Sequence, residues 1–354
     1  CTVLMDGKPV NSCSLLAAKA EGHRIETIEG IGENPEQGWK KTTGFSKLQQ
    51  EFIKSGAIQC GYCTPAMILA AKSLLDKEEA PTEEQIRDSI SGVLCRCTGY
   101  LKPVQAITAV AGKEKIQYRP DIHSTVSGVA FERVGKEDAK VDAFKLVQGK
   151  SAFTDDYEKR GMLHAKVLHS PIAHGSIKSI DVSQAKQLPG VHAVLTYKDL
   201  PRVAYSTAGQ SDPIPGPLDM FSLDNKVRFV GDRVAFVAAE TEEIAEKALS
   251  LIKVEYEELP ALFTSEDSMK PGAPILHDEA EYVNFADSDP KKNLAAEIRI
   301  DIGNVDQGFL EADEVFENVF EVPKVQQAHI EPHVALSYWD ENDRLVIRTS
   351  TQVP

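Results

Sequence analysis

The sequence predicts a multidomain α+β protein, because three stretches of the chain differ in character. Residues 1–36 open with a strand pattern around an Asp-Gly turn, residues 37–112 carry helix caps and helical apolar spacing, and residues 147–275 alternate strand-like runs with a helix. A chain of 354 residues with 42% hydrophobic content has enough apolar surface for two or three separate cores. We therefore expect each stretch to fold as a domain.

The first stretch is predicted to hold a hairpin and one further strand. Residues 3–5 and 10–13 flank Asp6-Gly7, and Asp-Gly suits the positive φ angles of a two-residue hairpin loop. Residues 24–28 fit a second short strand. Cys13 is thereby expected at the end of a strand.

The second stretch is predicted to be a compact helical bundle with cysteines in its loops and at its helix tips. Two residue pairs have the spacing of capping boxes, in which side chains satisfy the first backbone N–H groups of a helix; they are Ser46 with Gln49 and Thr82 with Gln85. Apolar residues recur at helical spacing between these caps, at Met67, Leu69, Ala70, Leu74 and Leu75.

The remainder of the chain is predicted to be a linker followed by α/β structure. Residues 113–146 have mixed charge and little periodicity, which is typical of a linker. Beyond it, strands are predicted at residues 163–168, 193–196, 234–238 and 251–256, with a helix at 242–249. Residues 314–347 alternate again and fit two or three strands of a further sheet.

The cysteines carry the strongest chemical signal in the sequence. Four of the six lie in Cys60-Gly61-Tyr62-Cys63 and Cys95-Arg96-Cys97. A Cys-x-x-Cys loop places two thiolates close enough to bind one iron or zinc ion, and Cys-x-Cys offers a second pair. Four thiolates complete either a tetrahedral site for one metal ion or a two-iron cluster.

Spacing alone leaves three interpretations of these cysteines open. A disulfide framework is disfavoured, because neighbouring Cys-x-Cys thiols bridge poorly and the domain has ample apolar residues of its own. A zinc ribbon has shorter intervals and usually lies on β-hairpins rather than between helices. An iron–sulfur cluster is the interpretation that the helical setting favours.

Charge and composition limit the partners. The net charge of −15 and the pI near 5.1 argue against nucleic acid, because surfaces that bind phosphates are basic. No apolar run reaches about eighteen residues, so no membrane span is expected. The chain opens on Cys1 without an initiator Met and ends at Pro354 just after an alternating segment, and we interpret it as a fragment cut at both ends.

Two cysteine motifs carry a resemblance to a known family. Residues 59–65 (Gln-Cys-Gly-Tyr-Cys-Thr-Pro) and 95–100 (Cys-Arg-Cys-Thr-Gly-Tyr) resemble the second iron–sulfur domain of the xanthine dehydrogenase and aldehyde oxidase family of molybdenum hydroxylases. In that family a preceding plant-type [2Fe-2S] domain ends with two cysteines that have eleven residues between them, which is the spacing of Cys1 and Cys13. The resemblance therefore accounts for all six cysteines.

The resemblance implies a role for each of these residues. Two [2Fe-2S] clusters and one molybdenum–molybdopterin cofactor are expected, with Gln59 and Cys97 near the pterin. The complete cluster would be held by Cys60, Cys63, Cys95 and Cys97, and the other cluster would take two of its four ligands from Cys1 and Cys13. The family's catalytic glutamate would follow Pro354, so no catalytic residue is expected in this chain and the fragment alone is expected to be inactive.

The later stretches extend the resemblance. Residues 149–156, 230–235 and 254–260 are similar to the family's hammerhead domain, and residues 329–332 and 349–352 are similar to the start of its large molybdenum-binding region. Two departures from the family pattern leave every thiolate in place: Ala66 stands where Gly is usual, and Leu101-Lys102-Pro103 is not the commonest form.

The resemblance also implies the complete fold. Residues 1–36 would end a plant-type ferredoxin-like β-grasp domain, 37–112 would form a four-helix-bundle [2Fe-2S] domain, 147–275 an α/β hammerhead domain, and 276–354 the first strands of a truncated molybdopterin-binding domain. The linker 113–146 is too short for the flavin domain that many relatives place there. The arrangement thus resembles flavin-free aldehyde oxidoreductases, or enzymes whose flavin is on another subunit.

The implied activity is hydroxylation of an aldehyde, a purine or another N-heterocycle with oxygen from water. Electrons would leave the molybdenum through the two clusters to an acceptor. The implied partners are a small-molecule substrate, an electron-acceptor protein or a separate flavin subunit, and a second copy in a homodimer. We expect a cytoplasmic protein, because six thiols without a disulfide framework suit a reducing compartment. The alternative is a non-catalytic iron–sulfur or zinc protein that serves in electron transfer or as a scaffold.

The histidines have ordinary interpretations. His164, His169 and His174 follow one another at five-residue spacing and do not share a face, so they are not expected to bind one metal ion. His329 and His333 alternate with Glu331 on a predicted strand, where they are expected to hydrogen-bond their neighbours.

Overall fold

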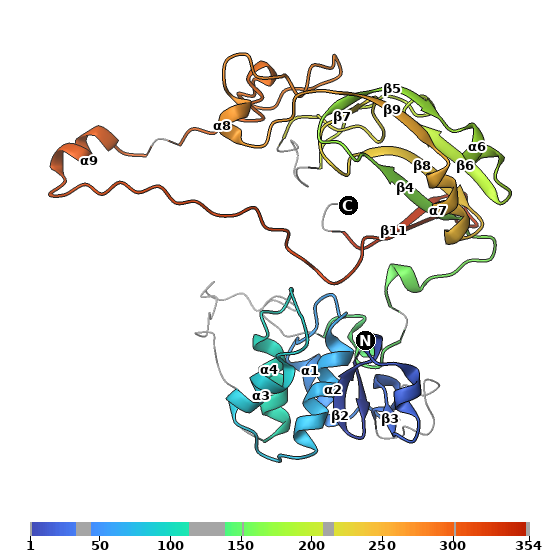
Figure 1. Ribbon diagram of the computed structural model, residues 1–354. Helices are drawn as coiled ribbons and strands as arrows, with labels where there is room; N and C mark the ends of the chain where they lie inside the picture. The colour runs from blue at the N-terminus through green and yellow to red at the C-terminus, as the bar shows by residue number, and fades with distance from the viewer. Residues whose placement is uncertain are drawn as a thin grey trace. The chain divides into compact units, whose positions relative to one another are not determined.

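The protein is described here by a computed structural model that covers residues 2–32, 44–112, 139–150, 152–207, 216–300 and 302–351. The chain divides into two compact units (Figure 1). The first unit consists of Cys1–Tyr157 with Glu321–Ser350, and the second of Glu158–Phe320 with Thr351–Pro354. Within the described residues, every helix is too short or too polar to cross a membrane.

A small antiparallel sheet opens the first unit. It has the strand order β2-β1-β3, formed by β1 (Thr2–Met5), β2 (Lys8–Asn11) and β3 (Ile25–Glu26). Asp6 and Gly7 both have positive φ (51° and 75°), as the Asp-Gly hairpin prediction requires. The predicted strand over residues 10–13 is shorter than expected, because the chain turns into a 3₁₀ helix at Ser12–Ser14.

Four helices form the predicted bundle of the first unit: α1 (Lys47–Lys54), α2 (Thr64–Leu75), α3 (Glu83–Ile90) and α4 (Leu101–Val110). Both predicted capping boxes are present: each cap hydroxyl accepts from the N3 backbone N–H, and the cap backbone N–H donates to the side chain of the N3 glutamine. Most of the largest buried side chains of the core come from these helices, among them Phe52, Met67, Ile68, Ile86, Ile90 and Ile107. The bundle thus has an apolar centre, with its cysteines at the ends of helices.

The short helix α5 (Ala143–Leu146) belongs to the core of the first unit, although it lies in the range predicted as a linker. Ala143, Leu146 and Val147 are at most 2% exposed and pack with the bundle. Residues 113–138 of that predicted linker lie outside the described residues. The end of the predicted linker is therefore an integral part of the helical unit.

A hairpin of β10 (Ala335–Trp339) and β11 (Leu345–Thr349) completes the first unit. The 3₁₀ turn Thr154–Asp156 precedes Tyr157, whose ring lies 3.9 Å from the guanidinium of Arg348 on β11. The prediction of two or three strands within residues 314–347 is met by β10 and β11, which lie at the end of that range, whereas residues 314–334 form no strand. The apolar side chains of residues 314–334 are largely exposed, and no described strand pairs with this segment. An alternating sequence forms a strand only where a neighbouring strand supplies backbone hydrogen bonds.

The second unit contains two three-stranded antiparallel sheets. One has the order β4-β8-β6 and the other β7-β5-β9. Their strands are β4 (His164–His169), β5 (Gly175–Asp181), β6 (Val191–Thr196), β7 (Lys226–Val227), β8 (Arg233–Ala239) and β9 (Lys253–Glu258). The strands predicted in this region are confirmed to within a few residues, but β5 and the two-residue strand β7 were not predicted.

Helices cover the strands of the second unit. α7 (Glu242–Ser250) is the predicted helix; the Thr241 side chain caps it, and it packs on β4 and β8 (Figure 1). The helix α6 (Ser183–Gln187) packs on β6. The core between them holds alanines at the close contacts, such as Ala185, Ala245 and Ala248. Two further short helices are α8 (Ser265–Ser268) and α9 (Val305–Glu311).

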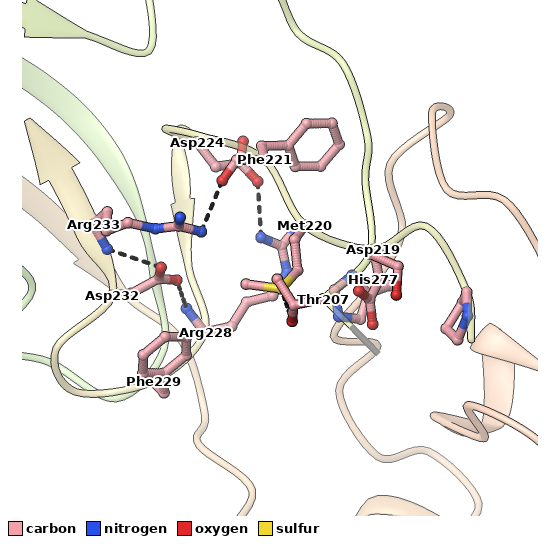
Figure 2. A pocket seen from close by; sticks show the side chains of 12 residues that line it. Thr207, Asp219, Met220, Phe221, Asp224, Arg228, Phe229, Asp232, Arg233 and His277 are labelled. Atoms are coloured by element: carbon pink, nitrogen blue, oxygen red, sulfur yellow. Dashed lines mark hydrogen bonds and ion pairs between the residues drawn. The ribbon is translucent and has the colours of Figure 1, made fainter. Parts of the chain in front are cut away.

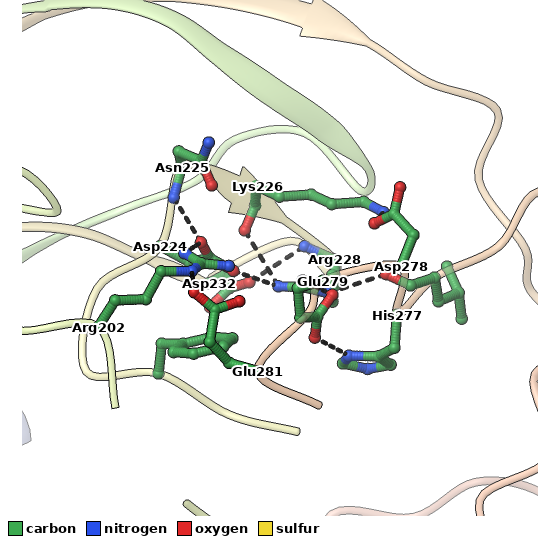
Figure 3. Close-up of polar contacts among 12 residues, drawn as sticks. Arg202, Asp224, Asn225, Lys226, Arg228, Asp232, His277, Asp278, Glu279 and Glu281 are labelled. Atoms are coloured by element: carbon green, nitrogen blue, oxygen red, sulfur yellow. Dashed lines mark hydrogen bonds and ion pairs between the residues drawn. The ribbon is translucent and has the colours of Figure 1, made fainter. Parts of the chain in front are cut away.

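A buried ionic network centred on Arg228 ties two segments of the second unit together (Figure 3). The guanidinium donates to Asp224 at 2.8 Å and to Glu279 at 2.9 Å, and the side chains of these carboxylates are only 9% and 5% exposed. Arg202 pairs with the second oxygen of Asp224. Burial by itself would raise the pKa of Glu279, but the hydrogen bond from His277 and the charge of Arg228 outweigh it and lower that pKa to about 2. Glu279 therefore stays ionised inside the network.

Candidate metal centre

The Cys-x-x-Cys loop lies immediately before α2. Cys63 is the residue that precedes the first turn of this helix, and Pro65 occupies an early helical position where its missing N–H costs nothing. Gly61 has φ +91°, a left-handed conformation that glycine adopts without strain. The tight loop therefore directs Cys60 and Cys63 toward the same end of the bundle.

The Cys-x-Cys loop lies before α4 and is closed by Tyr100. This residue has φ +65°, and its hydroxyl accepts the Cys95 N–H at 2.8 Å while donating to the Val93 carbonyl at 3.0 Å. The Thr98 hydroxyl lies 3.1 Å from the Cys95 sulfur. Tyr100 and Thr98 were recognised in the sequence only as motif residues, although their closeness along the chain to Cys95 could have suggested these contacts.

The fold brings the four predicted thiols together in two pairs. Cys97 Sγ lies 3.6 Å from Cys60 Sγ, and the thiols of Cys63 and Cys95 are hydrogen-bonding partners. Among the described residues, no three His, Cys, Asp or Glu side chains converge on the position of one metal ion. Two thiol pairs fit a two-iron cluster, where each iron takes two thiolates, better than a single tetrahedral zinc ion.

The thiols differ in burial and in pKa. Cys63 and Cys95 are buried, whereas Cys60 and Cys97 are half-buried. Burial raises the pKa of Cys60 to about 11, and raises that of Cys63 still further because Cys95 and Cys60 lie nearby. Burial also acts to raise the pKa of Cys95, but its hydrogen bonds with Thr98 lower it overall. A bound metal would supply the positive charge that deprotonates such thiols.

The remaining predicted site residues are Cys1, Cys13 and Gln59, and among the described residues Cys13 is not brought together with another predicted ligand. Cys13 is exposed in the 3₁₀ turn, with its sulfur 3.7 Å from the Ser14 hydroxyl, and Cys1 lies outside the described residues. That these two cysteines supply two ligands of one cluster therefore stays a prediction. Gln59 is exposed beside Cys60.

The histidines largely have the ordinary environments that were expected. His169 Nδ1 and His174 Nδ1 each lie 2.7 Å from a backbone carbonyl, of Gly231 and Pro260 respectively. His329 and His333 do not alternate on a strand, because the chain bends between them and their Nε2 atoms approach to 3.0 Å.

A cleft of about 310 Å³ in the second unit was not anticipated (Figure 2). Its apolar wall includes Met220, Phe221 and Phe229. The guanidinium of Arg233 is already occupied by the Tyr205 hydroxyl and the Phe221 carbonyl, and Arg228 belongs to the ionic network. The polar groups of this cleft therefore serve mainly the fold, and the four thiols are the stronger candidate site.

Three family models match successive parts of the chain. Residues 27–108 match a [2Fe-2S] binding domain, residues 148–260 match the a/b hammerhead domain of aldehyde oxidase and xanthine dehydrogenase, and residues 285–354 match a molybdopterin cofactor-binding domain. The order of the three matches is the order predicted from the motifs.

Known proteins share this arrangement. A probable hypoxanthine oxidase of Escherichia coli is 39% identical over 378 residues, which cover 99% of this chain and 38% of that protein. The structure of the aldehyde oxidoreductase from Desulfovibrio gigas superposes with a TM-score of 0.71 at 29% identity, and the match covers 99% of this chain and 38% of that one. The chain thus spans 38% of the length of these two relatives.

In another relative the same regions are on separate subunits. The small FeS subunit of nicotinate dehydrogenase from Eubacterium barkeri is 51% identical over 102 residues, covering 29% of this chain and 60% of that subunit. Its large molybdopterin subunit is 32% identical over 228 residues, covering 64% of this chain and 49% of that subunit.

The helical bundle with its four thiols, followed by a hammerhead fold, defines an iron–sulfur protein joined to part of a molybdopterin-binding protein. The chain belongs to the xanthine dehydrogenase and aldehyde oxidase family of molybdenum hydroxylases. Its cofactors are accordingly iron–sulfur and molybdenum–molybdopterin.

The hydroxyl of Tyr100 is expected to stabilise the Cys-x-Cys loop measurably. Tyr100→Phe leaves the Cys95 N–H and the Val93 carbonyl without this partner, so the free energy of unfolding of the bundle should fall by about 1–2 kcal/mol. Urea unfolding followed by circular dichroism measures this change. Tyr157→Phe is the matched control in the same unit, because it removes a hydroxyl from a ring that contacts Arg348 through its face. Equal stability of the two variants would contradict the role assigned to the Tyr100 hydroxyl.

Proposed function

We propose that this chain is the electron-transferring part of a molybdenum hydroxylase that oxidises an N-heterocycle or an aldehyde. The proposal rests mainly on the arrangement of four thiols in two contacting pairs, Cys60 with Cys97 and Cys63 with Cys95. The same chain continues into a segment that matches a molybdopterin cofactor-binding domain. Four thiolates at two positions suit a [2Fe-2S] cluster, which accepts one electron at a time.

The ligand roles follow from this proposal. One [2Fe-2S] cluster is held by Cys60, Cys63, Cys95 and Cys97, and a second cluster takes two of its ligands from Cys1 and Cys13. Gln59 and Cys97 are the residues of this chain that we propose to approach the pterin. The hydrogen bond between Thr98 and the Cys95 sulfur stabilises negative charge on that sulfur, and such bonds raise the reduction potential of a cluster.

The molybdenum cofactor, when bound, supplies the chemistry that adds a water-derived oxygen to an electron-poor carbon. The residues of this chain contribute by holding the cluster at a defined position, by hydrogen bonding to its sulfurs and by excluding water from it. Electrons then pass to an acceptor protein or to a separate flavin subunit, and the whole protein is proposed to be a homodimer in the cytoplasm.

The substrate class is proposed from the relatives. The chain is 39% identical to a protein described as a probable hypoxanthine oxidase and 29% identical to the aldehyde oxidoreductase of known structure. This difference favours an N-heterocycle of the purine type over an aldehyde.

Metal analysis and substrate reduction of the full-length protein test the proposed function. We expect about four irons and one molybdenum per protomer, and bleaching of the cluster absorbance under anaerobic conditions by a purine more rapidly than by an aldehyde. Zinc without iron would instead support the alternative of a zinc-bearing scaffold. Iron without molybdenum, and without bleaching by either substrate, would support a non-catalytic electron-transfer protein.

A further inference from the structure

The short helix α5 covers the Cys-x-x-Cys loop. The Leu146 side chain is 2% exposed and lies directly against Gly61, the residue that follows Cys60. A Cβ atom on Gly61 would stand 2.6 Å from both Cδ atoms of Leu146, which is closer than real Cβ contacts. The leucine therefore occupies the space that any side chain at Gly61 would need.

Several contacts hold α5 in this position. Gln49 is completely buried, and its Nε2 donates to the Val147 carbonyl at 2.7 Å, while its Oε1 accepts from the Ser46 N–H. The Phe144 and Phe45 rings pack with their centroids 5.8 Å apart. The position of Leu146 is thus determined by the core of the bundle and not by the thiols that it covers.

We infer that Leu146 is a positioning residue for the cluster proposed at Cys60, Cys63, Cys95 and Cys97, and that it keeps water away from the Cys60–Cys63 side of that cluster. The inference rests on the proposed function, since it assumes that these thiols bind iron. Under this inference, a residue of α5 forms part of the surroundings of the cluster, although α5 lies beyond the [2Fe-2S] domain match, which ends at residue 108.

The physical consequence is an effect on reduction potential. A thiolate-ligated cluster gains negative charge on reduction, and water stabilises the more highly charged state more strongly than an apolar wall does. Removal of the apolar cover should therefore move the midpoint potential to a more positive value. The same opening should let chelators reach the iron.

The test uses the full-length protein with its cofactors. In Leu146→Ala, the midpoint potential of one [2Fe-2S] signal, followed by electron paramagnetic resonance during a redox titration, should shift to a more positive value while the other signal keeps its potential. Iron loss to a chelator should be several-fold faster. Leu146→Met, which retains most of the apolar volume, should restore the potential of the unmodified protein.

Leu69→Ala is the matched control. Leu69 is an equally buried leucine (1% exposed) of the same core, but it lies six residues beyond Cys63 on α2, or roughly 9 Å along the helix axis. It should lower stability without moving either potential. If Leu146→Ala does not retain its cluster, Leu146→Val is used in its place, and its midpoint potential should also shift to a more positive value.

The outcomes separate the inference from the proposed function. Iron-loaded Leu146→Ala with unchanged potential, or equal shifts in Leu146→Ala and Leu69→Ala, would overturn the role of Leu146 and leave the cluster assignment intact. Absence of iron from the unmodified protein would overturn the proposed function itself, and the inference with it.

Discussion

Cys60→Ser in the full-length protein should abolish one of two [2Fe-2S] signals in electron paramagnetic resonance and leave the other unchanged. Cys60 lies 3.6 Å from Cys97, so its loss removes one of the two thiolates that we assign to the same iron. Serine is a poor substitute, because iron–sulfur clusters are held by thiolates. Iron content should fall from about four to about two atoms per protomer.

The reciprocal variant is the control for this result. Cys13→Ser changes an exposed thiol in the 3₁₀ turn and should remove the other signal while sparing the first. Persistence of both signals in Cys60→Ser would show that the ligand assignment is wrong. Loss of both signals in either variant would show that the two sets of cysteines do not hold separate clusters.

Arg228→Met is expected to lower the stability of the second unit by about 3 kcal/mol, because it removes the guanidinium that two buried carboxylates share. Asp224 keeps its ion pair with Arg202 and Glu279 keeps its contact with His277, so each carboxylate loses part of its charge compensation. Arg228 is 12% exposed, and its partners Asp224 and Glu279 are 9% and 5% exposed. Glu279 has its pKa lowered to about 2, so it is charged at neutral pH and cannot avoid the cost by neutralisation. Hydrogen exchange of the β8 amides measures the effect.

Lys270→Met is the matched control for the network. Lys270 pairs with Asp267 on the surface, where the two side chains are 67% and 49% exposed, and exposed pairs contribute about 0–1 kcal/mol. The hydrogen-exchange rates of the β8 amides in Lys270→Met should remain close to those of the unmodified protein. If the β8 amides of Arg228→Met were as well protected from hydrogen exchange as those of Lys270→Met, the buried network would not be needed for stability.

Local signals in the sequence predicted local structure well. The Asp6-Gly7 turn and the caps at Ser46 and Thr82 are present as predicted. Each of these features depends on residues at most three positions apart, whose backbone conformation and hydrogen bonds are determined largely by their own chemistry. Such features can be recognised without knowledge of the rest of the fold.

Elements that depend on distant partners were missed or wrongly predicted. β5 has few apolar residues and is a strand because it pairs with β9, more than seventy residues away. α5 is a single turn, too short for a periodic signal, and it is stable because the bundle buries it. The stretch 314–347 does contain two of the two or three strands predicted for it, β10 and β11, but the alternation did not show that residues 314–334 would form no strand.

The sequence by itself predicted a thiolate metal centre, because metal ligation needs particular donor atoms at short intervals along the chain. Spacing alone left the kind of centre open, and the resemblance of the two cysteine motifs to a known family pointed to a molybdenum hydroxylase, a family that the domain matches support. Only the tertiary structure decided which thiols are neighbours, with Cys60 beside Cys97 and Cys63 beside Cys95. It also decided that Leu146 covers the loop. These contacts join segments more than thirty residues apart along the chain, and their distances depend on how the helices pack rather than on any local preference.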